Sequence, residues 1–562
     1  MEHIMEELYR KYEKMGLKPY GAVPNYRQME WYKREGNVFF HFGMNTFTDK
    51  EWGDGTENPK DFNPTELDVR QWIKTIKNAG FDCAILTAKH HDGFCLWQTK
   101  YTSHSVKSSP YKNGNGDIVK EFTDACKEFG IKAGIYLSPW DRHEKTWGSD
   151  DYNDFYCGQL EELLTNYGKI WEVWWDGAGS TKCHYDWDRW ANTVKKYQSD
   201  AVIFGSLGAT PYVDVRWVGN EKGIAGKPCY ATIDEISLVV ETTSELNAGK
   251  IGGERFIPAE ADVSIRPGWF YHSHQDGQVR TPKNLIELWF NSIGSNAGFL
   301  INLPPDRRGL LHENDVKSLT EYNRILKEQF SVNLAQNARV EASTSRQECE
   351  ANNILSTEIV YAPLDTDKTP EIVITFKEES EINTISISEL IELGHRVTDI
   401  DFFAKVEGKY QLLFNSKVIG YKLCQHFDTV KTDKIKIKIN SALDTPILHS
   451  FGAYKLDEAL FREDQSQNVH KIIEDVSIKD NFVVANFGGI FPFNKIKVEN
   501  AGKCKVSLLA FNGTDYDYLQ CYEAEKDLYI DLGYIVDYAY QIKLEFIEGT
   551  PNNISKIEII KS

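Results

Sequence analysis

Short apolar runs alternate with helix-like stretches from residue 37 to about residue 305, which is typical of βα units built on a parallel sheet. The predicted strands are Asn37–Met44, Cys83–Ala88, Ala133–Ser138, Trp171–Asp176 and Ala201–Ser206. Helical spacing of apolar residues appears between them, near residues 69–76, 118–129, 155–167 and 187–198. Thr65 is a predicted cap for the first helix, and Gly130 is a predicted stop for the second. The alternation predicts either a (β/α) barrel or an open, doubly wound sheet.

Length and one missing motif favour the barrel. About 250 residues is typical of eight β/α units, and residues 37–330 leave room for insertions. No G-x-G-x-x-G sequence follows a predicted strand, so the main support for a dinucleotide-binding sheet is missing. We therefore predict an α/β fold in which residues 1–330 form a (β/α)8-like barrel.

The pattern changes after about residue 332 to alternation with a period of two, which is typical of antiparallel strands. A polar stretch, Asp457–Asn468, interrupts this alternation. We predict two small all-β sandwich domains, over residues 332–458 and 468–562. Their alternating apolar positions include Ile372, Ile374, Ile435, Ile437, Ile496, Val498, Leu528 and Ile530.

Composition narrows the range of partners. The 64 basic and 83 acidic residues give a formal net charge of -19, a sign that repels nucleic acid and anionic membranes. Aromatic residues make up 13% of the chain and suit the flat apolar faces of sugar rings. The ten cysteines show no disulfide or metal-type spacing, so we expect buried free thiols. We expect neither a nucleic acid nor a membrane as partner, and the sequence leaves the oligomeric state open.

The first residues, MEHIMEELYRKYEKMG, are charged and lack the apolar run of a signal peptide. No stretch of about 18 apolar residues occurs elsewhere. We expect a soluble, cytoplasmic protein from the chain as written, and a periplasmic or extracellular one if a leader was removed.

Polar residues at strand ends are the first candidates for chemistry, because the active site of a barrel lies at the carboxyl ends of its strands. The predicted strands contain or lead into His41, His90, His91, Asp92, Tyr136, Asp141 and Asp176. A further carboxylate, Glu221, lies in a later loop. Tryptophans that follow predicted strands could contact sugar faces, and these are Trp52, Trp97, Trp140, Trp217 and Trp269.

Asp176 and Glu221 are candidates for the two carboxylates that cleave a glycosidic bond. This reaction needs one ionised carboxylate near the anomeric carbon and one protonated carboxyl group, about 5 to 5.5 Å apart in a retaining enzyme. Structural alternatives stay open, since Asp176 could cap a βα turn and Glu221 could be a surface residue beside Lys222.

His90, His91 and Asp92, together with His41, allow three interpretations. Imidazole and carboxylate groups bind divalent metals, which would fit a metal-dependent hydrolase. Adjacent residues of a strand point to opposite sides, however, so both histidines can ligate one ion only if the backbone turns. The histidines could instead bind sugar hydroxyls or pack behind the site. The aromatic surroundings favour hydroxyl binding.

Six motifs in register resemble the α-L-fucosidases of glycoside hydrolase family 29. They are HFGMNTFTDKEWGDGTE, LTAKHHDGFCLWQTKYTSHSVK, GIYLSPWD, EVWWDGA, RWVGNEKG and AEADVSIRPGWFYH, and the resemblance covers roughly residues 20–310. It is closest to the branch that prefers α-1,3 and α-1,4 fucosyl linkages on branched, Lewis-type glycans. A non-hydrolytic glycan-binding protein on the same fold stays as an alternative, although both motif carboxylates are present.

The resemblance implies a retaining exo-α-L-fucosidase that needs no cofactor and no metal. It gives Asp176 the role of nucleophile and Glu221 that of acid and base. It also implies fucose contacts from His41, Glu51, Trp52, His90, His91, Tyr136 and Trp174. Arg266 would touch the sugar or orient a carboxylate. The stretch NLAQNARVEASTSR, with the strand pattern through Tyr454, resembles a discoidin-type sandwich and makes residues 332–458 a candidate carbohydrate-binding module.

Overall fold

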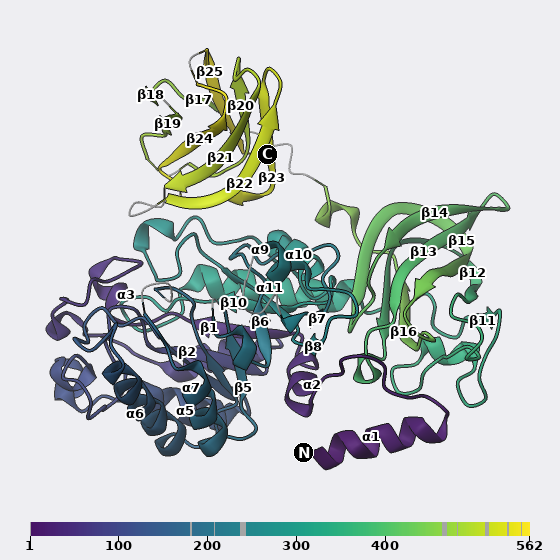
Figure 1. Ribbon diagram of the computed structural model, residues 1–562, viewed down its shortest axis with the longest axis horizontal. Helices are drawn as coiled ribbons and strands as arrows, with labels where there is room; N and C mark the ends of the chain where they lie inside the picture. The colour runs from purple at the N-terminus through teal and green to yellow at the C-terminus, as the bar shows by residue number, and fades with distance from the viewer. Residues whose placement is uncertain are drawn as a thin grey trace. The chain divides into compact units, whose positions relative to one another are not determined.

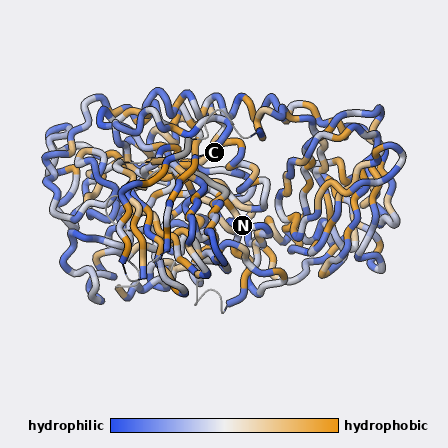
Figure 2. Tube along the Cα trace, turned by 90° about the horizontal axis from the view of Figure 1, so that it is seen from above, coloured by the Kyte–Doolittle hydropathy of each residue, from blue (hydrophilic) through white to orange (hydrophobic). Residues whose placement is uncertain are grey.

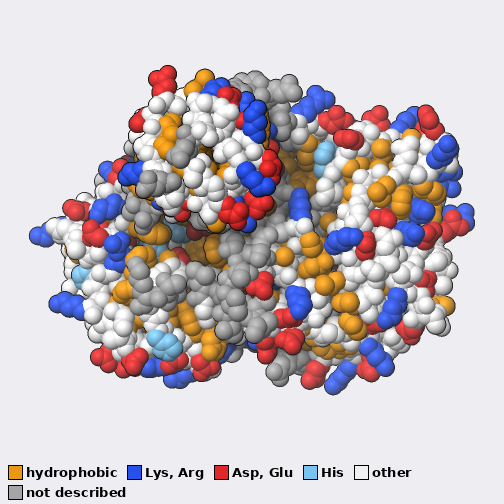
Figure 3. All heavy atoms as spheres, turned by 45° about the horizontal axis from the view of Figure 1, so that its top comes forward, with side chains coloured by type: hydrophobic (Ala, Val, Ile, Leu, Met, Phe, Trp, Pro, Cys, Tyr) orange, Lys and Arg blue, Asp and Glu red, His pale blue; other side chains and the backbone are white. Residues whose placement is uncertain are grey.

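The computed structural model forms two compact units, residues 1–460 and residues 461–562 (Figure 1). The structure describes residues 2–179, 183–206, 208–235, 243–462, 469–479, 481–489, 491–511, 516–536, 539–551 and 553–561. No helix within these ranges has both the length and the apolar character needed to cross a membrane. On the face shown in Figure 3, acidic and basic side chains are interspersed.

A closed barrel of eight parallel strands lies in the first unit, as predicted. The order around the barrel is β1, β10, β9, β6, β5, β4, β3 and β2, and β1 closes the ring by pairing with both β10 and β2. The strands are β1 (Gly36–Phe40), β2 (Cys83–Lys89), β3 (Lys132–Leu137), β4 (Glu172–Trp174), β5 (Val202–Gly205), β6 (Val215–Trp217), β9 (Ala259–Ser264) and β10 (Gly298–Asn302).

The first strand is shorter than the predicted run Asn37–Met44. It ends at Phe40, because the chain then turns into the short helix α3 (Met44–Thr48). His41 therefore lies immediately beyond the carboxyl end of the strand, where a side chain can face a site rather than the barrel core.

Helices connect most of the strands, and amphipathic patterns account for them. The helices are α1 (Glu2–Lys14), α2 (Tyr26–Tyr32), α4 (Val69–Asn78), α5 (Ile118–Phe129), α6 (Asp151–Asn166), α7 (Trp187–Tyr197), α9 (Thr243–Ala248), α10 (Pro282–Asn291) and α11 (Glu313–Gln329). The cap of α4 is Asp68 rather than the predicted Thr65, since the Asp68 side chain accepts the N–H of Gln71. Gly130 ends α5 in the left-handed conformation, φ 69°, as predicted.

Two connections depart from a regular β/α repeat. The described residues between β5 and β6 contain only a turn of 3-10 helix, η5 (Thr210–Tyr212). Between β6 and β9 the chain forms a small two-stranded sheet, β7 (Thr232–Ile233) with β8 (Arg255–Phe256), in addition to α9. The loop that carries Glu221 belongs to this irregular part.

The barrel interior contains a buried pair of carboxyl groups as well as apolar side chains. In Figure 2, hydrophobic residues are concentrated in the inner parts of the chain trace. Glu172 of β4 and Glu260 of β9 are fully buried, and the Asn37 amide donates to Glu172 at 3.4 Å and to Glu260 at 3.0 Å. The indoles of Trp31 and Trp174 also donate to Glu260, at 3.3 and 3.2 Å. Burial raises the pKa of Glu260 to about 7 and that of Glu172 well above its ordinary value.

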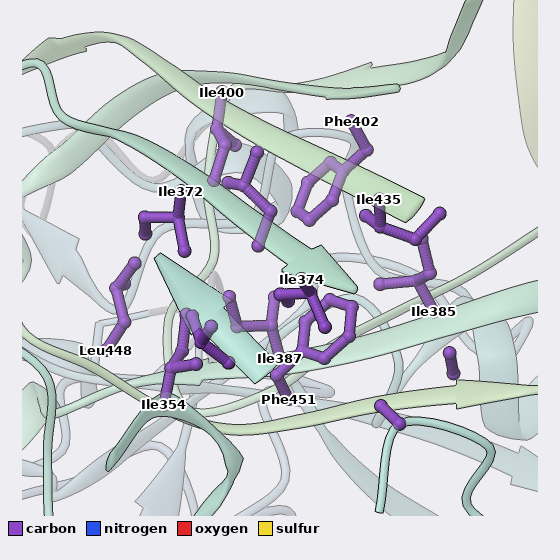
Figure 4. Packing of buried hydrophobic residues seen from close by; sticks show 14 of the residues in the cluster. Ile354, Ile372, Ile374, Ile385, Ile387, Ile400, Phe402, Ile435, Leu448 and Phe451 are labelled. Carbon is purple, nitrogen blue, oxygen red and sulfur yellow. The ribbon is translucent and has the colours of Figure 1, made fainter. Parts of the chain in front are cut away.

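An antiparallel sheet follows the barrel, in the order β11, β12, β15, β13, β14, with β16 also paired to β12. Its strands are β11 (Arg339–Ala342), β12 (Glu371–Glu389), β13 (Val397–Val406), β14 (Lys409–Ser416), β15 (Leu423–Ala442) and β16 (Leu448–Tyr454). The long strands β12 and β15 shift register twice along their pairing, and such irregularities let strands bend around a core. The predicted alternating isoleucines fill that core, and Figure 4 shows Ile372, Ile374, Ile385, Ile387, Ile400 and Ile435 converging there.

This sheet packs directly on the barrel within the first unit. The rings of Tyr32 and Tyr421 stack at 4.9 Å, and Asn296 accepts the N–H of Tyr421 at 2.7 Å. His395 accepts the N–H of Ala231 at 3.2 Å. Barrel and first sandwich thus belong to one compact unit, and a separate domain over residues 1–330 stays a prediction.

The described residues of the second unit form two antiparallel sheets. One has the order β17, β25, β20, β23, and the other β18, β19, β24, β21, β22. The strands are β17 (Val469–Ile472), β18 (Val476–Lys479), β19 (Phe482–Asn486), β20 (Phe493–Glu499), β21 (Cys504–Phe511), β22 (Tyr516–Ala524), β23 (Leu528–Val536), β24 (Gln541–Glu548) and β25 (Lys556–Lys561). Predicted positions such as Ile496 and Ile530 are buried in its core. Of the predicted polar stretch Asp457–Asn468, residues 463–468 lie outside the described residues.

All ten cysteines are free thiols, as expected, and most are buried. Burial raises the pKa of the Cys83 and Cys126 thiols well above the ordinary value, which disfavours the reactive thiolate.

Candidate active site

Asp176 lies just beyond the carboxyl end of β4, where the sequence pattern predicts a reactive group. Its side chain is 27% exposed. The hydroxyl of Tyr136 donates to Oδ2 at 2.9 Å, and the N–H of Ala178 donates to Oδ1 at 2.8 Å. Asp176 therefore does accept a bond within its own turn, as the structural alternative proposed. The same two donors fix the carboxylate in one orientation while part of it stays open to a ligand.

Glu221 is exposed and lies in the loop that follows β6. Its Oε2 accepts a hydrogen bond from the indole N–H of Trp269 at 3.1 Å. The loop is tied to β9 by two backbone bonds, from Val218 N to Glu260 O and from Gly223 N to Asp262 O, both 3.0 Å. Glu221 is therefore exposed, but its side chain and its loop are both held by hydrogen bonds.

Three side chains connect the two carboxylates across the end of the barrel. Tyr136 bonds to Asp176, and Trp269 bonds to Glu221. The imidazole ring of His41 lies between them, with its centroid 6.0 Å from that of Tyr136 and 5.1 Å from that of Trp269. The structure therefore brings Asp176 and Glu221 to one site around His41.

The tautomer of His41 follows from its partner, Asn302. The Asn302 amide nitrogen donates to the carbonyl of Trp269 at 2.7 Å and to the hydroxyl of Ser264 at 2.9 Å. Its oxygen must then accept from His41 Nδ1, at 2.9 Å. Neutral His41 consequently has Nε2 free of a proton, as a hydrogen-bond acceptor.

The two histidines after β2 take opposite tautomers. Ser138 donates its hydroxyl proton to the carbonyl of Trp140 at 2.6 Å, so it accepts from His91 Nδ1 at 2.8 Å, which makes His91 Nε2 an acceptor. His90 Nδ1 accepts from the Asn45 amide nitrogen at 3.3 Å, so in His90 the proton is on Nε2. His41 and His91 therefore offer hydrogen-bond acceptors and His90 offers a donor, which are the two kinds of partner that a sugar hydroxyl needs.

Burial keeps all three histidines neutral near pH 7. It lowers the pKa of His41 to about 3 and that of His91 to about 4. It lowers the pKa of His90 well below the ordinary value, with a further contribution from the neighbouring His91. His91 Nε2 lies 3.7 Å from Asp176 Oδ2, and a neutral ring there leaves the carboxylate charge uncompensated by an imidazolium.

Trp52 and Trp174 occupy different positions around this site. Trp52 is 42% exposed and meets the ring of His91 edge to face at 5.8 Å, with Trp140 at 5.6 Å. Trp174 is buried, and its ring stacks on Phe204 at 4.0 Å. The exposed Trp52 is suited to contact a sugar face, whereas Trp174 forms the floor beside Tyr136.

The prediction that Trp97 could contact a sugar face is wrong. Trp97 does not face a ligand, because it is 1% exposed and its indole donates to Glu162 at 2.9 Å. It is a core residue. Asp92 also has a structural role in the described chain, since it is buried and accepts the N–H of Phe94 at 2.8 Å within the turn that follows His91. Burial raises the pKa of Asp92 to about 7.

Glu51 and Arg266 make contacts that the sequence did not specify. Glu51 accepts the backbone N–H groups of Trp269 at 2.8 Å and Phe270 at 3.2 Å. Arg266 is buried and donates to Asp315 and Asp276, both at 2.9 Å. The carboxylates that Arg266 orients are therefore those two, and its predicted contact with sugar stays a prediction.

Among the described residues, one group has ligand atoms close enough to hold a metal ion: Asp49, His272 and His274, within 4.8 Å of one another. The histidine pair after β2 does not form such a group in the part of the chain described. Both ring nitrogens of His272 already bond to carboxylates, at 2.8 Å to Asp49 and 2.7 Å to Glu51. His272 therefore has both ring nitrogens engaged by protein carboxylates.

Two residues of the site, Asn302 and Asp262, were missed in the sequence. Asn302 ends β10, so the strand-end rule would have found it. Asp262 lies within β9, two residues after Glu260, and accepts the indole N–H of Trp217 at 2.9 Å. Burial, with the nearby charge of Glu221, raises the pKa of Asp262 well above its ordinary value. Glu260 and Asp262 stand two positions apart in one strand, so their side chains share a face, and this pattern could have identified Asp262 from the sequence.

The model of the α-L-fucosidase family matches residues 12–329, which contain every residue of this site. The chain belongs to the α-L-fucosidase family. As a fucosidase it is a glycoside hydrolase, and its barrel followed by a β-sandwich is the architecture of glycoside hydrolase family 29.

Relatives match this fucosidase well beyond the barrel. Alpha-L-fucosidase 1 of Arabidopsis thaliana is 38% identical over 457 residues, 78% of this chain and 89% of the relative. A solved structure from Bacteroides thetaiotaomicron, provisionally described as an α-L-fucosidase, has a TM-score of 0.77 at 42% identity and covers 78% of this chain and 99% of its own. A family 29 fucosidase from Ruminococcus gnavus, solved in complex with fucose, has a TM-score of 0.73 at 33% identity and covers 79% of this chain and 97% of its own.

Proposed function

We propose that this fucosidase is a retaining exo-enzyme that removes terminal α-1,3- or α-1,4-linked L-fucose from branched, Lewis-type glycans. The observation that carries the proposal is the joint placement of Asp176 and Glu221 at the carboxyl end of the barrel, connected through Tyr136, His41 and Trp269. Neutral histidines that can bind hydroxyl groups lie between them. The fucose complex of the Ruminococcus gnavus relative supports fucose as the sugar.

The proposed first step forms a bond between Asp176 and the anomeric carbon. The bond between that carbon and the leaving oxygen breaks at the same time, and Glu221 gives its proton to the oxygen. In the second step Glu221 takes a proton from water, whose oxygen attacks the anomeric carbon and releases Asp176. Two displacements restore the original anomeric configuration.

The remaining site residues bind and orient the sugar in this proposal. His41 and His91 accept hydrogen bonds from sugar hydroxyls through Nε2, and His90 donates one. Trp52 covers an apolar face of the ring. Glu51 contacts the sugar through its partly exposed side chain, of which 36% is accessible.

The stereochemistry of the first product tests the mechanism. We expect time-resolved NMR of an aryl α-L-fucoside reaction to detect α-L-fucose as the first product, before mutarotation. A 2-deoxy-2-fluoro fucosyl donor with a good leaving group should label Asp176, which peptide mass spectrometry would locate. Release of β-L-fucose as the first product would disprove a retaining mechanism.

Linkage preference rests on the resemblance of motifs such as EWGDGTE to the α-1,3/1,4 branch. We expect kcat/KM on Lewis-type trisaccharides to exceed that on α-1,2-linked fucosyllactose by at least about 10-fold, the size of a difference of one or two contacts. Equal kcat/KM values on the two substrates would disprove the proposed linkage preference but would not affect the assignment as a fucosidase.

A further inference from the structure

The segment that follows β9 carries Trp269, the residue whose indole N–H donates to Glu221 at 3.1 Å. Its backbone is held on both sides. Glu51 accepts the N–H of Trp269 at 2.8 Å, and the Asn302 amide donates to the Trp269 carbonyl at 2.7 Å. Glu51 also accepts the next N–H, that of Phe270, at 3.2 Å. The position of the indole, and hence of its bond to Glu221, depends on the Glu51 carboxylate.

His272 holds Glu51 in place from the same segment. Its Nε2 lies 2.7 Å from Glu51 Oε1, and its Nδ1 lies 2.8 Å from Asp49 Oδ1. The ring is buried, with 7% of the side chain exposed. Burial opposes a charge on this ring, but the two carboxylates outweigh it and raise the pKa of His272 above the ordinary value. A protonated His272 can donate to both carboxylates at once.

Close packing leaves Glu51 little freedom within this arrangement. A Cβ atom at Gly268 would lie 2.4 Å from Glu51 Oε1, so the carboxylate occupies the space that any side chain at position 268 would need. Glu51 is thus held by His272 and by two backbone N–H groups, and the missing side chain at Gly268 leaves the space that its carboxylate occupies.

We propose that His272, bridging Asp49 and Glu51, is a positioning residue for the acid and base Glu221. His272 orients Glu51, Glu51 orients the backbone of Trp269, and the Trp269 indole orients the Glu221 carboxyl group. The inference rests on the proposed role of Glu221. It goes beyond that role, because it assigns a function to two residues, His272 and Asp49, that do not themselves face the reacting atoms.

Loss of His272 should impair proton donation more than nucleophilic attack. Asp176 is held separately, by Tyr136 and by its own turn, so its orientation does not depend on the segment after β9. Only substrates with poor leaving groups require protonation of the leaving oxygen. A positioning role therefore predicts a dependence on the leaving group, whereas a purely structural role, or the loss of the proposed sugar contact of Glu51, predicts equal losses on all substrates.

The experiment compares His272→Gln and His272→Phe with the unmodified full chain. Measured are kcat and KM for an aryl fucoside with a good leaving group and for a fucosylated oligosaccharide with a poor one. For His272→Phe we expect kcat/KM, which reports the first step and its need for an acid, to fall about 10- to 100-fold more on the oligosaccharide than on the aryl fucoside, within the range for general acid catalysis. His272→Gln, which keeps one donor, should recover part of the loss.

His274→Gln is the matched control, because His274 is exposed in the same segment and, among the described contacts, it is His272 and not His274 that bonds to Glu51. Its kinetics should stay within about 2-fold of the unmodified enzyme, inside the usual scatter for surface substitutions. If His272→Phe fails to fold by circular dichroism, Asp49→Asn replaces it, since it removes one charge from the bridge and keeps the shape. It should give a smaller loss, of about 3- to 10-fold, with the same dependence on the leaving group.

Glu221→Gln, assayed on the same substrates, distinguishes a failure of the proposed role of Glu221 from a failure of the proposed role of His272. If Glu221→Gln loses equally on both substrates, the proposed function of Glu221 fails. If Glu221→Gln shows the dependence on the leaving group but the His272 variants lose equally on both substrates, or lose nothing, the positioning role of His272 is overturned and the proposed function stands.

Discussion

The end of the barrel and its interior use the same kind of side chain in opposite ways. At the end, Asp176 is partly exposed, with a donor on each oxygen, and Glu221 is exposed beside Trp269. In the interior, Glu172 and Glu260 are fully buried, and burial raises their pKa values. Glu172 and Asp176 are only four residues apart along the same chain segment. Depth along the barrel axis, rather than residue type, decides which carboxyl group can react.

Trp174 separates the two layers. Its ring stacks on Tyr136 at 5.6 Å, next to the site, while its indole N–H donates to Glu260 at 3.2 Å, in the interior. The contrast between the layers can be tested by removing one carboxyl group at a time, with a kinetic effect expected at the end of the barrel and an effect on stability in the interior.

Asp176→Ala should have the largest effect. We expect kcat to fall on the order of 10⁴-fold or more, as when other covalent nucleophiles are removed. Binding of fucose, measured by calorimetry, should persist because the histidines remain. Added azide should restore part of the rate and give a product of inverted configuration. An Asp176→Ala enzyme with full activity on an aryl fucoside would end the assignment.

Glu221→Ala should come next and should be selective. On oligosaccharides kcat/KM should fall about 10²- to 10⁴-fold, the range of general acid catalysis, and on activated aryl fucosides the first step should be much less affected. Steady-state rates over a series of leaving groups would measure this. Equal losses across the series would point to a role in binding.

Tyr136→Phe should have an intermediate effect, because it removes the hydroxyl that donates to Asp176 Oδ2 and keeps the ring. A hydrogen bond to a charged group contributes about 1.5 to 3 kcal/mol, so we expect a loss of roughly 10- to 100-fold in kcat. Unlike the Glu221 variant, it should lose similarly on all leaving groups. Tyr212→Phe, a change at an exposed tyrosine, is the control.

Glu260→Gln should change kcat least and should alter stability instead. Because the pKa of Glu260 is raised to about 7 in the fold, its favourable contribution is complete below its unfolded pKa and is lost as pH rises from about 4.5 to about 7. The neutral amide should flatten this fall, by an amount on the order of 1 to 3 kcal/mol. Thermal unfolding at pH 5 and pH 8 would measure it, with Glu358→Gln as an exposed control. A variant whose Tm still falls as steeply would contradict the raised pKa.

The barrel could be predicted from sequence because its strands and helices differ in periodicity, and the sandwiches because their isoleucines alternate. Asp176 and the histidines were found because strand ends converge in a barrel wherever the strands come from. The early end of β1 and the cap at Asp68 were missed, since several residues near each position have similar local propensity.

The sequence by itself determined the α/β order of elements and the carboxylate and histidine types at the strand ends. Only the tertiary structure decided that Trp97 is core, that Arg266 serves Asp315 and Asp276, and that His272 reaches Glu51. Those contacts join residues from 10 to 221 positions apart. Local patterns report on the backbone within a few residues, whereas partners at such separations are set by how whole elements pack.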